Sequence, residues 1–233
     1  MAAALRGRLI SGSFAADILP SLPFFQRPSL AIRRAMERCA EQISDRLGPA
    51  ASVRAVADVA VLPSLAVLGF TAVARSDTPS SSHMETVSGT RPGPPVLITA
   101  YGASLERVWR AAVHRAIVTD ATWCFCCNGQ QLRVVDARRT WSRAYLEFDL
   151  RTALEDVDGQ ALLWSLLRAD ALIPPSSTLE EAIEQSARHG AVVCRALGRG
   201  VLDAITVLLG ALKPTDRQDA SIVFDQRTSV RSV

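Results

Sequence analysis

The stretch Trp123–Leu150, WCFCCNGQQLRVVDARRTWSRAYLEFDL, carries the clearest fold signal in the chain. Within it, two apolar runs, 122–127 and 131–135, flank the dipeptide formed by Asn128 and Gly129. Because Asn-Gly accepts the positive φ angles of a type I′ turn, this pattern predicts a β-hairpin. The end of the stretch alternates again between polar and apolar residues, which predicts one more strand in the sheet or along its edge.

The segment before this hairpin predicts further helices and strands. Apolar residues recur at three- and four-residue spacing in the helical parts, and Ser, Gly and Pro stand at the expected ends. The expected elements are a helix at 29–47, a helix from Ser52 that bends or ends near Pro63 with Gly69 as its terminator, strands at 70–74 and 96–100, and a helix at 104–118.

Two segments lack a sustained period. Residues 1–28 are expected to form a poorly patterned lead-in that is extended or partly ordered. Residues 75–95 are rich in Ser, Thr, Pro and Gly, which predicts a loop or hairpin insertion at the surface.

The chain after the hairpin is predicted to be helical over 151–212. One helix is expected around 159–172, and the next opens at Ser177 or Thr178 with a glutamate three residues on, the capping-box pattern. Glycines at 190, 198 and 200 predict a kink or a break in that second helix, and residues 213–233 are predicted to be a disordered tail.

The predicted fold class is therefore α+β or α/β. A mixed sheet with packed helices would occupy residues 29–150, with the loop insertion at 75–95, and an all-helical part would follow.

Composition fits a globular protein. The chain has 233 residues with 48% hydrophobic and 21% charged residues, which excludes a disordered chain and a polytopic membrane protein. The longest uncharged stretch, 59–74, contains Pro63 and is too short to span a bilayer, so no membrane role is expected. The net charge is +3, and Lys213 is the only lysine among the 26 basic residues. Such a uniform arginine bias weakens any single arginine as a sign of phosphate recognition.

The five cysteines predict a reducing compartment. Their number is odd and three of them lie within four positions, which suits neither a disulfide framework nor a zinc site. We interpret them as small buried hydrophobes in a cytoplasmic protein, with Cys124 and Cys126 on one face of a strand and Cys127 on the other. The five are Cys39, Cys124, Cys126, Cys127 and Cys194.

No motif predicts a catalytic or metal-ligating residue. The chain lacks a G-x-S-x-G elbow, a P-loop and a G-x-G-x-x-G loop. Its three histidines, His83, His114 and His189, have no neighbouring residues that favour catalysis, and we interpret them as solvated or structural.

A cluster of four arginines is the main candidate for binding. Arg133, Arg138, Arg139 and Arg143 lie within eleven positions, with Asp136 as the only acid among them. Such a group, with the aromatic Trp141 among the arginines, suits contacts with nucleic-acid phosphates or bases. The alternative is a solvated hairpin face whose arginines pair with the acid-rich segment 151–187.

The same stretch resembles the N-terminal region of type IIG-like restriction–modification methylases, which fuse a nuclease to an adenine-specific DNA methyltransferase. The segments LERVWRAAVHRAI, LLWSLLRADAL and EQSARHGAVVCRALGRGVLDA extend the resemblance over residues 30–212, and Cys127 departs from the Thr that is frequent there. The matching residues are Asn128, Gly129, Leu132, Arg133, Asp136, Arg138, Arg139, Ser142, Arg143, Leu146, Glu147, Phe148, Asp149 and Leu150.

The resemblance implies a PD-(D/E)xK nuclease-like core that has lost its chemistry. That motif needs an Asp and an acid-x-Lys on adjacent strands to hold a divalent metal, whereas the matching strand here, Val96–Ala100, has neither an acid nor a lysine. The methyltransferase half, with its Asn/Asp-Pro-Pro-aromatic motif, is absent. S-adenosylmethionine and Mg²⁺ are thus expected only in the full-length family, and no cofactor is expected in this chain.

The sequence hypothesis is a truncated or split N-terminal module, non-catalytic by itself. It would serve as a scaffold and contact the backbone of double-stranded DNA through the four arginines, beside a methyltransferase subunit or domain. Two alternatives remain open: a divergent metal-dependent nuclease that uses Asp77 or Glu85, and an assembly module whose long helix at 179–209 docks a partner helix.

Overall fold

The computed structural model describes residues 5–78, 80–172 and 177–211. The chain divides into two compact units, residues 1–190 and residues 191–233. The predicted tail at 213–233 lies outside the described residues.

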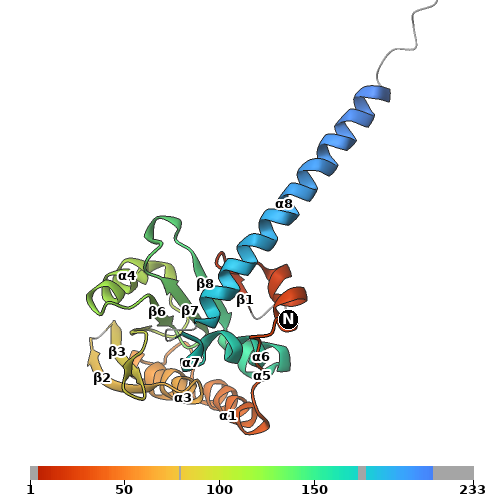
Figure 1. Cartoon of the computed structure of the whole chain (residues 1–233). Coiled ribbons are helices and arrows are strands. Elements are labelled where there is room, and N and C mark those ends of the chain that lie inside the picture. Colours follow the sequence, from red (N-terminus) through yellow and green to blue (C-terminus); the bar gives the residue numbers. More distant parts are fainter. Residues whose placement is uncertain (1–4, 79, 173–176, 212–233) are drawn as a thin grey trace, which may run out of the picture. The chain divides into compact units, whose positions relative to one another are not determined.

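The first unit is built on an eight-stranded mixed sheet (Figure 1). Its strand order is β1-β8-β7-β6-β5-β3-β2, and β4 pairs with β3 beside this path. Only β5 and β6 run parallel among the paired strands of the described chain, and the other pairs are antiparallel. The strands are β1 (Leu5–Gly7), β2 (Thr71–Asp77), β3 (Ser81–Ser88), β4 (Arg91–Pro92), β5 (Val96–Thr99), β6 (Trp123–Cys127), β7 (Gln131–Asp136) and β8 (Tyr145–Asp149).

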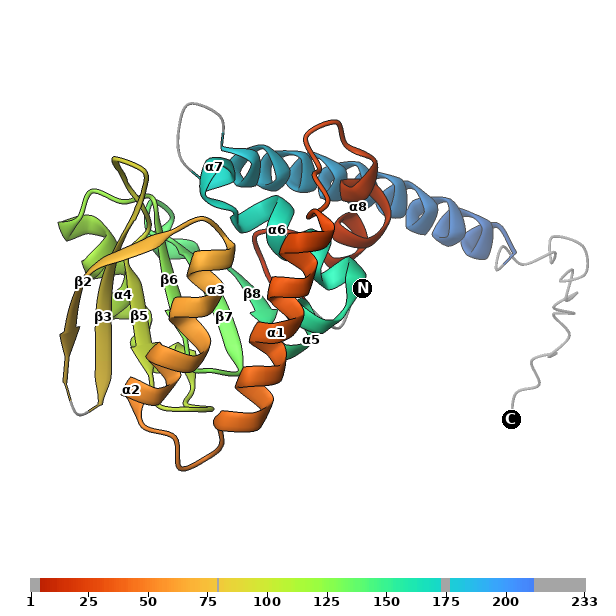
Figure 2. The ribbon, with the colours of Figure 1, turned by 90° about the horizontal axis from the view of Figure 1, so that it is seen from below.

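Helices cover both faces of this sheet, so the expected mixed sheet with packed helices is confirmed (Figure 2). One face packs against a large core cluster that the helices before and after the sheet share. The opposite face packs against α4 (Trp109–Val118), which follows the short 3-10 turn Leu105–Val108. The helices on the first face are α1 (Leu30–Arg46), α2 (Val53–Val56), α3 (Leu62–Val67), α5 (Leu150–Glu155), α6 (Val157–Leu167) and α7 (Ala169–Leu172).

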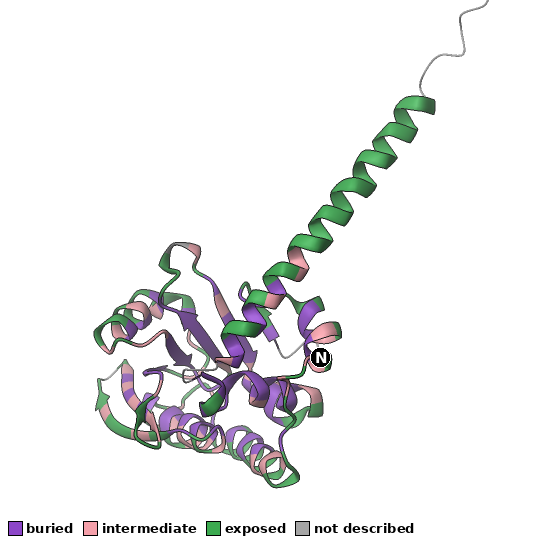
Figure 3. Cartoon of the chain, viewed as in Figure 1, coloured by how far each residue is buried: buried purple, intermediate pink, exposed green. Residues whose placement is uncertain are grey.

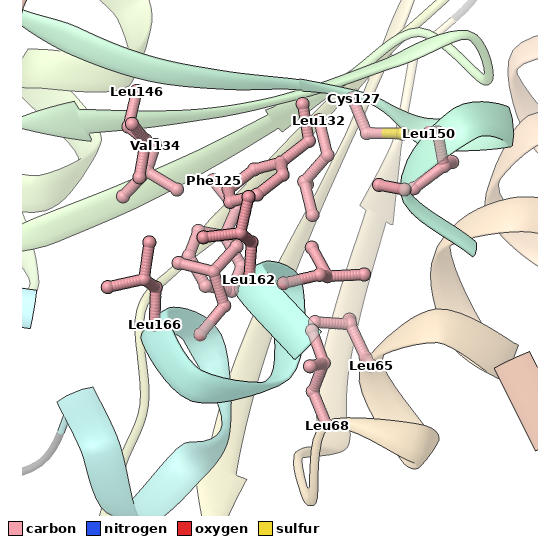
Figure 4. Packing of buried hydrophobic residues seen from close by; sticks show 14 of the residues in the cluster. Leu65, Leu68, Phe125, Cys127, Leu132, Val134, Leu146, Leu150, Leu162 and Leu166 are labelled. Atoms are coloured by element: carbon pink, nitrogen blue, oxygen red, sulfur yellow. The ribbon is translucent and has the colours of Figure 1, made fainter. Parts of the chain in front are cut away.

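The strand β6 divides its side chains between the two cores. Phe125 and Cys127 belong to the large cluster, whereas Cys124 and Cys126 face the α4 side, as predicted from strand alternation. Figure 4 shows Leu162 of α6 close to Phe125, with side chains of α3 and of the neighbouring strands around them. The centre of the sheet is therefore buried on both faces (Figure 3).

The predicted hairpin of β6 and β7 is confirmed, but its turn is not type I′. Pairing runs from Trp123 with Asp136 to Cys127 with Leu132. Gly129 has a positive φ of 81°, whereas Asn128 is not among the described residues with positive φ. Because the Asn128 side-chain oxygen accepts the N–H groups of two later residues, at 2.9 and 2.7 Å, it satisfies the turn in place of the I′ backbone geometry.

The predicted starts of the two helical segments that precede the sheet, at Ser29 and Ser52, are confirmed. The hydroxyl oxygens of Ser29 and Ser52 accept the N–H groups of Ile32 and Ala55, so each serine caps its helix. Gly69 has a φ of 87° and ends the helical segment, as predicted.

The predicted loop insertion at 75–95 is wrong for residues 81–88, which form the interior strand β3. The hairpin alternative holds, because β3 pairs with β2 on one side and with β5 on the other. Its buried residues Ser82, Met84 and Thr86 recur with period two, and the Thr86 hydroxyl donates to the Pro94 carbonyl at 2.7 Å. Because two of these three are polar, the period is hidden when only apolar residues are followed.

The N-terminal segment is more ordered than a lead-in. Strand β1 pairs with β8 at the end of the sheet, a π-helical turn follows at Phe14–Ile18, and a 3-10 turn follows at Leu19–Ser21. Ile10 and Phe14 are almost fully buried, so the segment adds to the core.

The C-terminal helix α8 (Thr178–Ala211) begins where predicted but does not break. The Ser177 hydroxyl accepts the N–H of Glu180, which is the expected cap. The helix is continuous past Gly190, because an exposed glycine costs a helix about 1 kcal/mol without preventing it. None of the helices that the structure describes is both long and apolar enough to cross a bilayer.

Candidate nucleic-acid interface

The arginine of the candidate cluster that lies inside the sheet is Arg133. It is 7% exposed, and its Nε donates to Oε2 of the buried Glu147 at 2.8 Å. Its Nη1 donates to Glu106 at 3.0 Å, and its guanidinium lies over the Tyr145 ring, 3.9 Å from the centroid. Burial works to lower the pKa of Arg133, but its pairing with Glu147 and Glu106 outweighs burial and the pKa is raised. The charge of Arg133 is thus neutralised by carboxylates of the protein itself.

The other three arginines lie in or beside the 137–144 connection and are largely exposed. Arg138 pairs with Glu180 at 2.8 Å, Arg138 and Arg139 each lie 3.6 Å from the carboxylate of Asp136, and Arg143 lies 3.5 Å from Glu106. The pairs of Arg138 with Glu180 and of Arg143 with Glu106 are exposed and contribute about 0–1 kcal/mol each, so a phosphate can replace those two carboxylates at little cost.

Asp136 fixes the start of this connection. It is 1% exposed, and its Oδ1 accepts the backbone N–H of Arg138 at 2.9 Å. Arg143 stands at the other end with a positive φ of 44°. Because a left-handed residue turns the chain sharply, the exposed arginines are presented on one short connection between β7 and β8.

Within the described residues, the predicted alternative, pairing with the acid-rich segment 151–187, is realised for Arg138 alone among the four. Its partner Glu180 lies in α8, whereas Arg133 and Arg143 share Glu106, which precedes α4. The acids that neutralise the cluster are therefore scattered along the sequence, and the fold brings them together.

A groove beside this connection adds an arginine that the sequence analysis missed. It has a volume of about 950 Å³ and is lined by Arg139, Ser142 and Ala144, by residues 7–11, and by Ile183, Ser186 and Ala187 of α8. Arg8 is exposed there, and within the described residues it has no salt-bridge partner. No acidic residue is among the described groove-lining residues. Residues 1–28 showed no period, so no sequence signal pointed to Arg8.

The acids of the alternative nuclease hypothesis do not share a site. Asp77 bonds to Arg75 and to the Ser82 hydroxyl, so it lies on the face to which Ser82 points. Glu85 pairs with Arg115 of α4 at 2.8 Å, on the opposite face. Within the described part of the chain, no group of three or more His, Cys, Asp or Glu side chains is arranged to hold a metal ion.

The three histidines lie on different elements, β3, α4 and α8, and three of the five cysteines lie on β6. His114 is exposed, and the ring of His189 lies 6.0 Å from that of Phe14. Four cysteines are buried as predicted, and burial raises the pKa of Cys127 to about 12. The prediction is wrong for Cys194, which is exposed on α8.

Comparison with known proteins gives no assignment: no protein-family model, no curated protein and no solved structure matches this chain.

Proposed function

We propose that this chain is a non-catalytic DNA-binding module with a degenerate nuclease-like core, similar to the N-terminal region of restriction–modification methylases. The observation that carries the proposal is the group of exposed arginines, Arg138, Arg139 and Arg143, beside a groove whose described lining has no acid. Guanidinium groups bind phosphate oxygens in bidentate fashion, and such contacts fix a protein on a DNA backbone.

The arrangement of elements supports the nuclease-like part of the proposal. Helix α1 is followed in the chain by the antiparallel strands β2, β3 and β5, by the crossover helix α4, and by β6 parallel to β5. This order is similar to that of the PD-(D/E)xK core. Many unrelated activities share one fold, so the chemistry depends on the side chains of the site.

The site argues for binding without catalysis. Strand β5 carries Leu97, Ile98 and Thr99 where the family motif needs an acid and a lysine, and all three are buried. In this proposal Mg²⁺ and S-adenosylmethionine act only in the full-length family, and a separate methyltransferase subunit or domain would supply the reaction.

Arg133 is left out of the proposed contact. Its guanidinium is buried and holds two carboxylates, so exposing it to a phosphate would leave Glu147 unpaired in the core. The proposed role of Arg133 is to join β7, β8 and the start of α4 beneath the exposed arginines.

The test is the salt dependence of binding to duplex DNA. The variant with Arg138, Arg139 and Arg143 changed to Ala should bind more weakly, and the slope of log affinity against log salt should fall by about 3, since each phosphate contact contributes about 0.9. A matched control replaces three exposed arginines of α1, Arg34, Arg38 and Arg46. The proposal fails if duplex binding is absent at low salt or if both triple variants lose affinity equally.

A second candidate function is assembly through α8, and a specific observation favours it. The helix face that is buried at Leu179 and Ile183 continues at three- and four-residue spacing after residue 190 through exposed apolar side chains. They include Leu197, Val201, Ile205 and Leu208.

We infer a second copy of this chain as the occupant of that face. The charged residues between 191 and 211, Arg195, Arg199 and Asp203, lie on the opposite side of the helix, so two such faces can meet without burying a charge. Light scattering tests this: Val201→Gln should shift the mass toward the monomer and Val192→Gln, on the charged side, should not. A wild-type chain that stays monomeric at high concentration overturns this candidate.

A further inference from the structure

The groove beside the 137–144 connection is lined by both charged and apolar residues. Arg8 and Arg139 reach it from two segments more than a hundred residues apart in sequence, and Ser142 adds a hydroxyl. The rest of its lining consists of Leu9, Ile10 and Ile183 together with small side chains. A ligand that complements this lining has an anionic group joined to a less polar group.

The electrostatics of the groove favour an anion. Arg8 has no salt-bridge partner within the described residues, and Arg139 lies 3.6 Å from Asp136, beyond direct hydrogen-bond distance. The described lining contains two arginines and no carboxylate, and the nearby Asp136 is buried behind Arg139, so the groove favours an anion.

Backbone hydrogen bonds attach the N-terminal segment at the groove. The N–H groups of Arg8 and Leu9 both donate to the Tyr145 carbonyl, at 3.0 and 3.3 Å, and the N–H of Ser11 donates to the Ser186 hydroxyl at 3.0 Å. These bonds connect the N-terminal segment to β8 and to α8, so the backbone of Arg8 is held at the groove.

The size of the groove exceeds what a bare phosphate needs. A volume of about 950 Å³ lies at the upper end of the range typical of small-molecule sites. A nucleotide unit combines a phosphate with a less polar base, which suits a lining of arginines and aliphatic side chains.

We propose that this groove binds one unpaired nucleotide of a DNA strand, with its phosphate at Arg8 and Arg139 and its base against the aliphatic residues of the lining. The inference rests on the proposed function, which it deepens by adding an unpaired nucleotide to the duplex backbone as a binding partner. No bond is made or broken in this step.

The sharpest test changes the charge of the groove without changing the fold. Ala187 lines the groove and is exposed on α8, where Glu and Gln are both good helix formers. Ala187→Glu should weaken binding of a short thymidine oligonucleotide by about tenfold, whereas Ala187→Gln should change it by less than about twofold. Arg8→Ala should weaken binding as Ala187→Glu does, and Arg110→Ala, an exposed arginine of α4, should have no effect.

Competition identifies the ligand class. Titration calorimetry should detect binding of thymidine monophosphate, and this nucleotide should displace the oligonucleotide more effectively than inorganic phosphate at equal ionic strength. Equal displacement by thymidine monophosphate and by inorganic phosphate overturns the nucleotide assignment, because the groove would then recognise only the anionic group. Equal binding by the Ala187→Glu and Ala187→Gln variants overturns the groove as the site.

The outcomes separate this inference from the proposed function. If duplex binding depends on Arg138 and Arg143 but oligonucleotide binding ignores Arg8 and Ala187, the groove inference fails and the proposed function stands. If thymidine monophosphate binds in a manner sensitive to Ala187→Glu but duplex DNA does not bind, the groove stands and the duplex contact fails. If neither ligand binds, both are overturned.

Discussion

Arg133 and Arg8 are the same residue type in opposite settings. Arg133 is buried between β8 and the start of α4 and holds two carboxylates, whereas Arg8 is exposed at a groove without a salt-bridge partner in the described chain. Arg138 and Arg139 stand between these extremes, exposed but close to the buried Asp136. The position of the nearest carboxylate therefore decides which arginines can bind a ligand, and the density of arginine in the sequence does not.

The largest expected effect comes from breaking the buried pair. Glu147→Gln removes the carboxylate that Arg133 Nε contacts at 2.8 Å and leaves a buried cation with only Glu106 as its acidic partner. The free energy of unfolding, measured in urea, should fall by about 3–5 kcal/mol.

A double variant is the control for that effect. Replacing both Arg133 and Glu147 by Met removes the two charges together and should restore most of the stability, since apolar side chains of similar volume substitute well for buried pairs. A Glu147→Gln cost below about 1 kcal/mol would place Arg133 with the exposed arginines and contradict the comparison.

Asp136→Asn tests the intermediate case. Asn keeps the side-chain oxygen that accepts the Arg138 N–H and removes the charge near Arg138 and Arg139. Stability should fall by only about 1 kcal/mol, and affinity for DNA should rise about threefold because the connection gains positive charge. Fluorescence anisotropy measures the change, with the exposed Asp45→Asn as control. An affinity that falls would show that Asp136 positions the arginines more than it competes with DNA.

A smaller effect is expected in the pH dependence of stability, through His83. Burial lowers the pKa of His83, and the nearby positive charge of Arg115, which pairs with Glu85, lowers it further. The folded chain thus binds this proton less well than the unfolded chain, so stability should decline as pH falls from about 6.5 through the lower folded-state pKa. His83→Gln should flatten that part of the profile measured by urea unfolding. If the slope of stability against pH is unchanged in this variant, titratable groups other than His83 determine it.

The smallest effect is expected at the groove. Arg8→Ala and Arg139→Ala should each change the free energy of unfolding by less than about 0.5 kcal/mol, since both side chains are exposed. Thermal unfolding followed by circular dichroism measures this. A large loss for either variant would assign that arginine a structural role like that of Arg133.

The sequence was sufficient for the local features of the fold. The hairpin at Asn128 and Gly129, the serine cap at Ser29, and the division of Cys124 and Cys127 between two faces all follow from spacing and turn chemistry. Each depends on residues that are close in the chain.

Features that depend on distant residues were not predictable. Strand β3 was missed because Ser82 and Thr86 are buried only once Pro94 and Asp77 supply partners. Phe14 lies in a segment without a period, and its ring lies 6.0 Å from that of His189, far along the chain. For the candidate site, the sequence indicated the arginines but not which of them is neutralised by Glu106 and Glu147.

The central claim is that the exposed arginines contact DNA phosphates while the buried one does not. The most direct measurement is the salt dependence of duplex binding for the wild-type chain and for Arg138→Ala, Arg139→Ala and Arg143→Ala combined. The account predicts a slope that falls by about 3 on removal of the three side chains and is unchanged in the matched α1 variant. No duplex binding at low salt, or the same slope in all three proteins, would contradict it.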